Sequence, residues 1–129
     1  MARLVALVAR RRQEADLLLV EGAGELLAPL DAQTTWSELA VRTGLPLLIV
    51  GANRLGTVNH CALTARVAAA AGLVVHGFVL SQPAAETDVS AATNAETIAT
   101  LTGLRCLRVL PHCAREEATS ALDAATQMP

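Results

Sequence analysis

Two short stretches of the sequence combine residue types that could bind a ligand. The first is Glu21-Gly22-Ala23-Gly24, which follows the apolar run Leu17–Val20. Such a run, bounded by Asp16 and a glycine turn, predicts a buried parallel strand, with its carboxylate at the end where open α/β sheets bind ligands. The glycines permit positive φ and close backbone approach to a bound group. The alternative, a strand that ends in a turn with Glu21 merely solvated, stays open from this stretch alone.

The second stretch follows the apolar run Leu47–Val50 and reads Gly51-Ala-Asn-Arg-Leu-Gly56-Thr57-Val58-Asn59. A strand, a glycine loop and a helix are the context of a phosphate-binding loop, but Thr57 stands where that loop has its lysine. What remains is a helix N-terminus, whose N–H groups at residues 57–59 could bind a carboxylate or phosphate. The alternative is that Thr57 only caps the helix.

The elements that must position these stretches alternate along the chain. Capping-box spacing over Thr35–Glu38 and a glycine at position 44 mark the bounds of one helix. Helices are expected near 4–15, 35–42, 57–71, 94–101 and 116–125, strands near 16–20, 47–50, 73–80 and 104–110, and a loop of small and acidic residues at 84–92. The pattern predicts one α/β domain over residues 1–129, with about four strands in a parallel sheet flanked by helices.

Composition narrows the function classes. The net charge of −2 argues against nucleic acid as a partner. All ten basic residues are arginine, so the chain contains no lysine. Cys61, Cys106 and Cys113 have no metal-site spacing and are expected to be reduced thiols of a cytoplasmic protein. The most apolar long window, 67–80, is interrupted and too short to span a bilayer, so no membrane association is expected.

Four motifs together resemble the dethiobiotin synthetase family, which belongs to the P-loop superfamily. They are Val20-Glu-Gly-Ala-Gly24, Asn53-Arg-Leu-Gly-Thr-Val-Asn-His60, Gly77-Phe-Val-Leu-Ser81 and Val109-Leu-Pro111. Their order and spacing are similar to the C-terminal half of that family. The resemblance implies a partial P-loop NTPase-like fold, with the P-loop half and its lysine absent from this chain.

The resemblance also implies a reaction and a set of binding residues. The family joins CO₂ to 7,8-diaminononanoate and closes a cyclic urea, using ATP and Mg²⁺. By resemblance Glu21 holds Mg²⁺, and Gly22, Ala23 and Gly24 form the loop on the phosphate side. The loop of Gly56, Thr57, Val58 and Asn59 takes the substrate carboxylate across a dimer interface. The residues beside the nucleotide base are Ser81, Gln82, Pro111, His112 and Cys113.

Departures from the family pattern leave three hypotheses open. Glu25 stands where the family has a further glycine, and Ser81 stands where it has an asparagine that reads adenine. Without lysine the chain alone is expected to be inactive, and no residue is assigned a catalytic role. The protein is then an incomplete or split dethiobiotin synthetase that needs a complementing N-terminal half, a non-catalytic binding or regulatory module, or a structural remnant without a ligand. Its expected partners are a small-molecule carboxylate and either a second copy of the chain or that N-terminal half.

Overall fold

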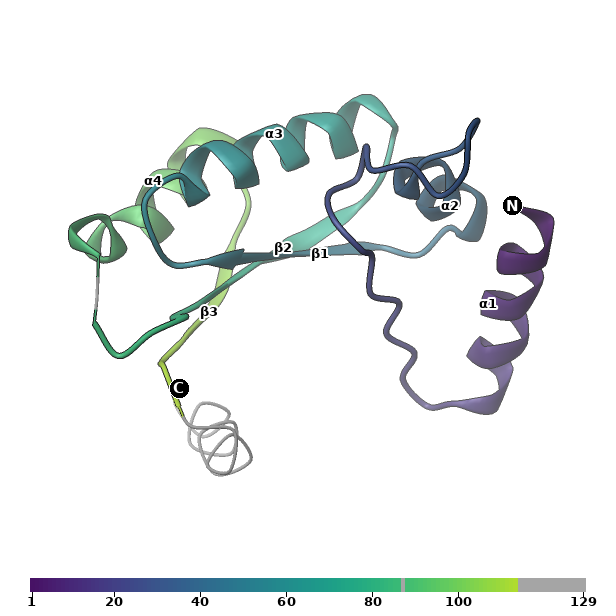
Figure 1. Ribbon diagram of the computed structural model, residues 1–129, viewed down its shortest axis with the longest axis horizontal. Coiled ribbons are helices and arrows are strands. Elements are labelled where there is room, and N and C mark those ends of the chain that lie inside the picture. Colours follow the sequence, from purple (N-terminus) through teal and green to yellow (C-terminus); the bar gives the residue numbers. More distant parts are fainter. Residues whose placement is uncertain (87, 114–129) are drawn as a thin grey trace. The chain divides into compact units, whose positions relative to one another are not determined.

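The computed structural model describes residues 1–86 and 88–113, and Figure 1 shows the course of the chain. The elements are α1 (Ala2–Glu14), α2 (Trp36–Thr43), β1 (Leu47–Ala52), α3 (Thr57–Ala70), β2 (Val75–Ser81), the 3₁₀ helix η1 (Val89–Ala92), α4 (Asn94–Thr102) and β3 (Cys106–Leu110). Each predicted helix or strand from residue 35 to residue 110 is confirmed within a few residues. The helix predicted over 116–125 lies outside the described residues.

The described strands form one sheet in the order β1-β2-β3. Hydrogen bonds from Leu47 N to Val74 O (2.8 Å) and from Asn53 N to Ser81 O (2.7 Å) flank the β1–β2 pair, which shows that both strands run the same way. β2 and β3 also pair in parallel, with Ser81 opposite Leu110. Helices α3 and α4 connect successive strands, because parallel strands need a crossover. The fold is therefore the predicted partial P-loop NTPase-like α/β fold.

The chain divides into two compact units. One comprises Met1–Leu47 with Arg66–Val75, and the other comprises Leu48–Ala65 with the chain from His76 onward. In the first unit α1 contacts α2, and Leu39 of α2 is buried. The prediction of a single domain over residues 1–129 stays a prediction.

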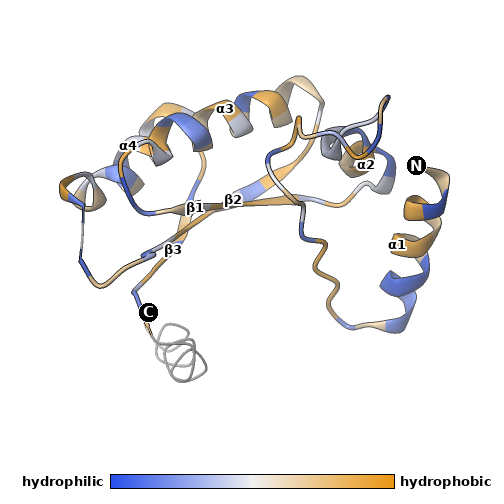
Figure 2. Cartoon of the chain, in the orientation of Figure 1, coloured by the Kyte–Doolittle hydropathy of each residue, from blue (hydrophilic) through white to orange (hydrophobic). Residues whose placement is uncertain are grey.

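The core of the second unit is built from apolar side chains of the strands and helices. Phe78 and Leu80 of β2 and Ile98 of α4 are completely buried, and Ile49 and Cys61 are nearly so. Figure 2 shows that the strands are coloured mainly as hydrophobic. Since the chain has only one Phe, one Trp and no Tyr, this core is mostly aliphatic. The strands of the sheet pack against this apolar core.

The strand predicted over residues 16–20 is wrong, because this segment takes no place in the sheet. It runs without regular secondary structure, and the side chains of Leu17 and Leu19 are 76% and 79% exposed. Glu21 consequently does not stand at the end of a strand. A strand exists only when a neighbour satisfies its backbone N–H and C=O groups, and no described strand pairs with this segment. The described sheet therefore has three strands, not about four.

The local signals around α2 are confirmed. The Glu38 carboxylate accepts a hydrogen bond from the Thr35 backbone N–H at 2.7 Å, as a capping box requires. Gly44 ends the helix in the left-handed region at φ 63°, and its N–H donates to Ala40 O at 3.0 Å. These contacts lie within a few residues of one another, which is why sequence alone could predict them.

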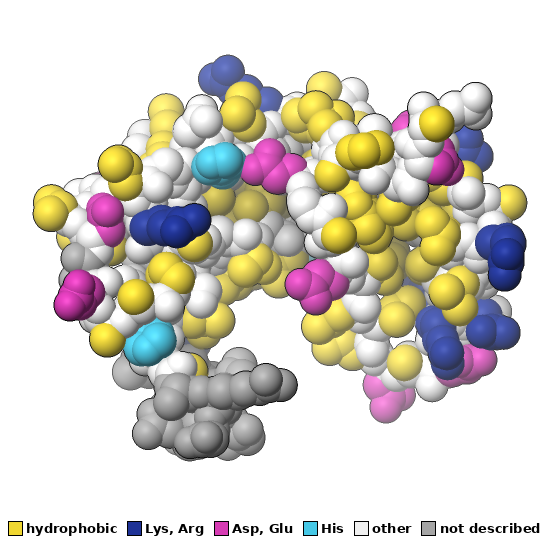
Figure 3. Space-filling model, in the orientation of Figure 1, with side chains coloured by type: hydrophobic (Ala, Val, Ile, Leu, Met, Phe, Trp, Pro, Cys, Tyr) yellow, Lys and Arg dark blue, Asp and Glu magenta, His cyan; other side chains and the backbone are white. Residues whose placement is uncertain are grey.

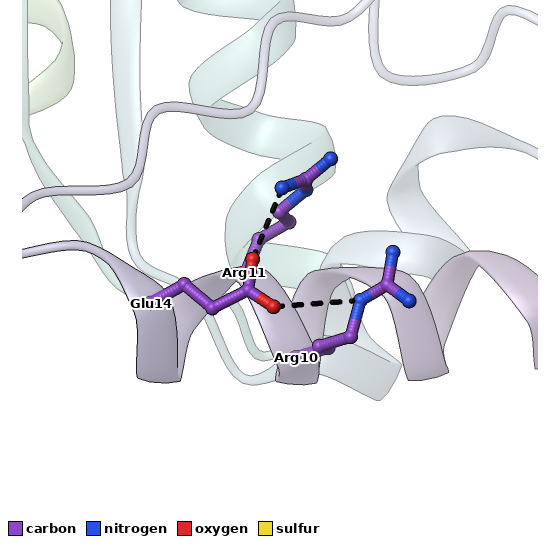
Figure 4. A network of polar contacts seen from close by, with 3 residues as sticks. All are labelled: Arg10, Arg11 and Glu14. Carbon is purple, nitrogen blue, oxygen red and sulfur yellow. Dashed lines mark hydrogen bonds and ion pairs between the residues drawn. The ribbon is translucent and has the colours of Figure 1, made fainter.

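Helix α1 carries most of the basic charge near the N-terminus on an exposed face. Figure 4 shows Glu14 between Arg10 and Arg11, at 3.7 and 3.0 Å. Figure 3 shows the basic side chains of this region spread over the surface beside acidic ones. Exposed pairs of this kind contribute about 0–1 kcal/mol to stability, so these arginines form a solvated face.

Neither α1 nor any other helix among residues 1–86 and 88–113 has the length and apolar character needed to cross a membrane.

Candidate functional site

The loop after β1 turns into α3 at Gly56, as the glycine pattern predicted. Gly56 has φ +94°, a conformation that side chains with a Cβ rarely adopt. Its carbonyl oxygen accepts the His60 N–H at 3.2 Å, which closes the first turn of α3. The Thr57 N–H donates to Arg54 O at 3.2 Å, so this group is not free for a ligand as the sequence had suggested.

Thr57 holds the start of α3 against the end of β1. Its side chain is 5% exposed, and its hydroxyl oxygen lies 3.8 Å from the Cys61 sulfur. A Cβ added to Gly51 would come within 2.7 Å of the same hydroxyl. Glycine at position 51 therefore permits the close approach of helix and strand. Thr57 is the first residue of α3, not its cap, so the capping alternative is wrong.

The N-terminus of α3 presents two backbone donors for an anion. The first three N–H groups of an α-helix have no acceptor within the helix, and here Arg54 O takes that of Thr57. The N–H groups of Val58 and Asn59 remain. They lie at the positive end of the helix dipole, which favours the binding of a carboxylate or a phosphate. Asn59 is exposed, so a ligand can reach this turn from solvent.

The residues predicted beside a nucleotide base come together at the ends of β2 and β3. The Gln82 N–H donates to Leu110 O at 2.9 Å, which extends the parallel pairing one residue past Ser81. A hollow of about 470 Å³ opens at this place, lined by Gln82, Ala85, Val109, Leu110, Pro111 and His112. Ser81 lies next to this hollow along β2, and Cys113 follows it along the chain. The hollow is open to solvent and its lining is mostly apolar.

Glu21 and its glycines lie in the first unit, in a different setting from the one predicted. Glu21 is exposed and lines a hollow of about 310 Å³ whose other walls are mainly apolar side chains of α1, α2 and residues 18–20. Gly22 faces the Trp36 ring, because an added Cβ would lie 3.4 Å from it. The Trp36 indole N–H donates to Ala23 O at 3.1 Å. The loop of residues 22–24 is thus fixed by Trp36.

The described residues gather no set of ligands around Glu21. No group of three or more His, Cys, Asp or Glu side chains in the part of the chain that the structure describes could hold a metal ion. Glu21 can offer one carboxylate, and Mg²⁺ usually keeps several waters beside one or two such ligands. The three cysteines, all among the described residues, form no disulfide bond, and burial raises the pKa of the Cys106 thiol.

A polar network near the loop after β1 was missed by sequence reasoning. Asn53 and Asn94 are 4% and 3% exposed, and the Asn94 side-chain amide donates to Asn53 Oδ1 at 3.0 Å. Ser90 joins the same network. The available signal was an asparagine directly after an apolar strand and another at the start of a helix. Neither pattern shows that the two residues meet.

Asp88 lies at the outer end of that network. The Ser90 hydroxyl and backbone N–H both donate to Asp88 Oδ1, at 2.6 and 2.8 Å. These bonds hold the pKa of the Asp88 carboxyl below its ordinary value, with a smaller contribution from the Leu55 N–H. An ionised Asp88 is consequently favoured in the folded state.

The parallel sheet with its flanking helices is a partial P-loop NTPase-like α/β fold, and a family model described as an AAA domain matches residues 1–119. The chain belongs to this family. It is 48% identical over 94 residues to the ATP-dependent dethiobiotin synthetase BioD of Anaeromyxobacter dehalogenans. This match covers 73% of this chain and 42% of that protein. It is 41% identical over 111 residues to the protein of the same name from Anaeromyxobacter sp. strain K, covering 86% and 50%. The chain is also 35% identical over 105 residues to the protein of the same name from Bacillus subtilis. This match covers 81% of this chain and 46% of that protein.

These similarities confirm the relationship to the dethiobiotin synthetase family that the motifs indicated. The chain spans about half the length of the relatives it matches.

Proposed function

We propose that this chain is a dethiobiotin synthetase-like component of biotin biosynthesis that binds the carboxylate of 7,8-diaminononanoate at the start of α3. The carboxylate accepts hydrogen bonds from the N–H groups of Val58 and Asn59, and the helix dipole stabilises its charge. The observation that carries the proposal is the close packing of Gly51 on Thr57, which fixes these donors at the end of β1. The names of the similar proteins support the same assignment.

In the same proposal the base of ATP lies against Ser81 and Gln82 on one side and Pro111, His112 and Cys113 on the other. The apolar hollow at the ends of β2 and β3 supports this part. Glu21 would offer one carboxylate to Mg²⁺. The described residues do not by themselves fit the triphosphate, because Trp36 fixes residues 22–24 and the chain has no lysine. We therefore assign no step of phosphoryl transfer to this chain.

The remaining groups come from a complementing N-terminal half, because a second copy of a chain without lysine cannot supply them. Two features support this part of the proposal. β1 is an edge of the described sheet, and Leu48 and Val50 on it are 49% and 66% exposed, although strands of parallel sheets are usually covered on both faces. Leu17 and Leu19 are exposed as well. Such edges pair readily with another chain. We place the protein in the cytoplasm, in keeping with three cysteines that form no disulfide bond among the described residues.

The substrate site can be tested on the isolated chain. Titration with 7,8-diaminononanoate is expected to shift the amide NMR signals of Val58 and Asn59, whereas the same diamine without its carboxylate should leave them in place. Asn59→Asp puts a second carboxylate beside these donors and should weaken binding about tenfold or more by charge repulsion. Asn59→Gln, the matched neutral change, should stay close to wild type. Equal shifts with both diamines would place the carboxylate elsewhere.

The catalytic part needs a second experiment. The chain is co-expressed with the N-terminal half of a complete dethiobiotin synthetase, and dethiobiotin formation is measured with ATP and Mg²⁺. Activity that appears only in the co-assembly supports the proposal. A soluble co-assembly without product would favour the second candidate, a non-catalytic binding module, which the fixed position of residues 22–24 against Trp36 also supports.

A further inference from the structure

A buried side-chain amide connects the two loops that flank the proposed site. Asn94, the first residue of α4, donates from Nδ2 to Asn53 Oδ1 at 3.0 Å, to Arg54 O at 3.3 Å and to Ser90 Oγ at 3.3 Å. The first two acceptors belong to the loop after β1, and the third belongs to η1. The Asn53 side-chain amide in turn donates a hydrogen bond to Ala91 O of η1 at 3.3 Å.

These bonds reach the proposed carboxylate site through one shared carbonyl group. Arg54 O accepts the Asn94 side chain and also accepts the Thr57 N–H at 3.2 Å. Thr57 begins the turn that presents the donors of Val58 and Asn59. The position of Asn94 therefore fixes the carbonyl group against which the first turn of α3 is built.

The same residues also reach the proposed base side. Asn53 donates its backbone N–H to Ser81 O at 2.7 Å, so the loop after β1 is tied to the end of β2. Ser90 holds Asp88 by its hydroxyl and its N–H, which sets the start of η1. A buried amide that loses its partners stays desolvated and unpaired, so neither loop can shift without disturbing the other.

We propose that Asn94 is a positioning residue that fixes the loop of residues 53–56 and thereby couples the carboxylate site at α3 to the base side at β2 and β3. This rests on the proposed function for the identity of the two ligands. Asn94 touches neither ligand and acts through Asn53 and Arg54. Its role differs from general stabilisation, because it acts on the loop after β1 and on η1 and not on the whole fold.

The positioning role can be tested without any ligand. The chain has no lysine, so trypsin can cleave it only after arginine. Arg54 is exposed within the loop, while Arg105 and Arg108 are exposed in the same unit outside the loop and report unfolding of that unit. Asn94→Ala should raise the cleavage rate after Arg54 about tenfold, because the loop loses its buried hydrogen bonds. Cleavage after Arg105 and Arg108 should stay within about twofold of wild type, as expected for independent sites.

Two further variants make the outcome decisive. Thr97→Ala, which removes an exposed hydroxyl bond within α4, is the control and should change no cleavage rate. Ser90→Ala removes one acceptor of Asn94 and should give a smaller increase after Arg54 if Asn94→Ala fails to fold. A rise at all arginines together, or no rise after Arg54 in either variant, would overturn the positioning role.

The coupling is measured with two defined probes. Diaminononanoate is titrated against the Val58 and Asn59 amide signals, with and without AMP. The wild-type chain should bind the diamine several-fold more tightly with AMP present, and Asn94→Ala should lose this difference. Equal coupling in both proteins would contradict the proposal. If neither probe binds the wild-type chain, the proposed ligands are wrong, while the cleavage experiment still judges the role of Asn94.

Discussion

Gly51→Ala is the most direct test of the contact between β1 and α3. The new methyl group would lie 2.7 Å from Thr57 Oγ1, 3.1 Å from Cys61 Sγ and 3.1 Å from Leu80 Cδ2. Contacts of this length force the start of α3 away from the strand. Gly51 does not have positive φ, so the cost arises from packing and not from backbone conformation.

The magnitude follows from two opposing effects. Overpacking a filled site costs about 1–3 kcal/mol. Replacing glycine by alanine within a strand returns about 0.5–1 kcal/mol, because the unfolded chain loses freedom. The free energy of unfolding should fall by about 1 kcal/mol. At a urea dependence of about 1–3 kcal/mol per molar, the midpoint of unfolding moves down by roughly 0.5 M.

A double-mutant cycle with Thr57→Ala identifies the cause. Removing the Thr57 hydroxyl relieves the shortest contact and leaves the two at 3.1 Å, so Gly51→Ala should cost clearly less in that background. In a Thr97→Ala background, which removes a hydroxyl bonded to Thr93 O, its cost should be unchanged. If Gly51→Ala costs the same in all three backgrounds, within the roughly 0.3–0.5 kcal/mol expected for independent sites, the packing argument is incorrect.

Two further outcomes are expected. Asp88 has a lowered pKa in the folded state, so its contribution to stability is present above its ordinary pKa of 3.8 and is lost as the pH falls through the lower folded pKa. Ser90→Ala should raise the Asp88 pKa, measured by carboxyl NMR. An unchanged pKa would show that the Ser90 hydroxyl is not the cause. Trp36→Phe keeps a ring against Gly22 but removes the hydrogen bond to Ala23 O; amide hydrogen exchange at residues 22–24 should become faster, and unchanged rates would assign the loop's order to ring packing alone.

The sequence by itself determined the elements whose causes are local. The capping box at Thr35 and Glu38, the glycine at position 44 and the apolar run of β1 each lie within a few residues, so their patterns predicted α2 and the first strand of the sheet. The turn at Gly56 was predicted for the same reason, because a left-handed residue before a helix favours glycine. The motif order also indicated the family before any fold was known.

Only the tertiary structure decided the features that depend on pairing between distant residues. The apolar segment 16–20 has the composition of a strand, but strand formation requires a partner with free N–H and C=O groups, and the described sheet supplies none. Asn53 and Asn94 stand 41 residues apart, and no local pattern relates them. Their contact arises because β1, β2 and α4 bring two loop ends together around a buried core. Burial then makes the hydrogen bonds between them necessary, since an unpaired amide in that place would be costly.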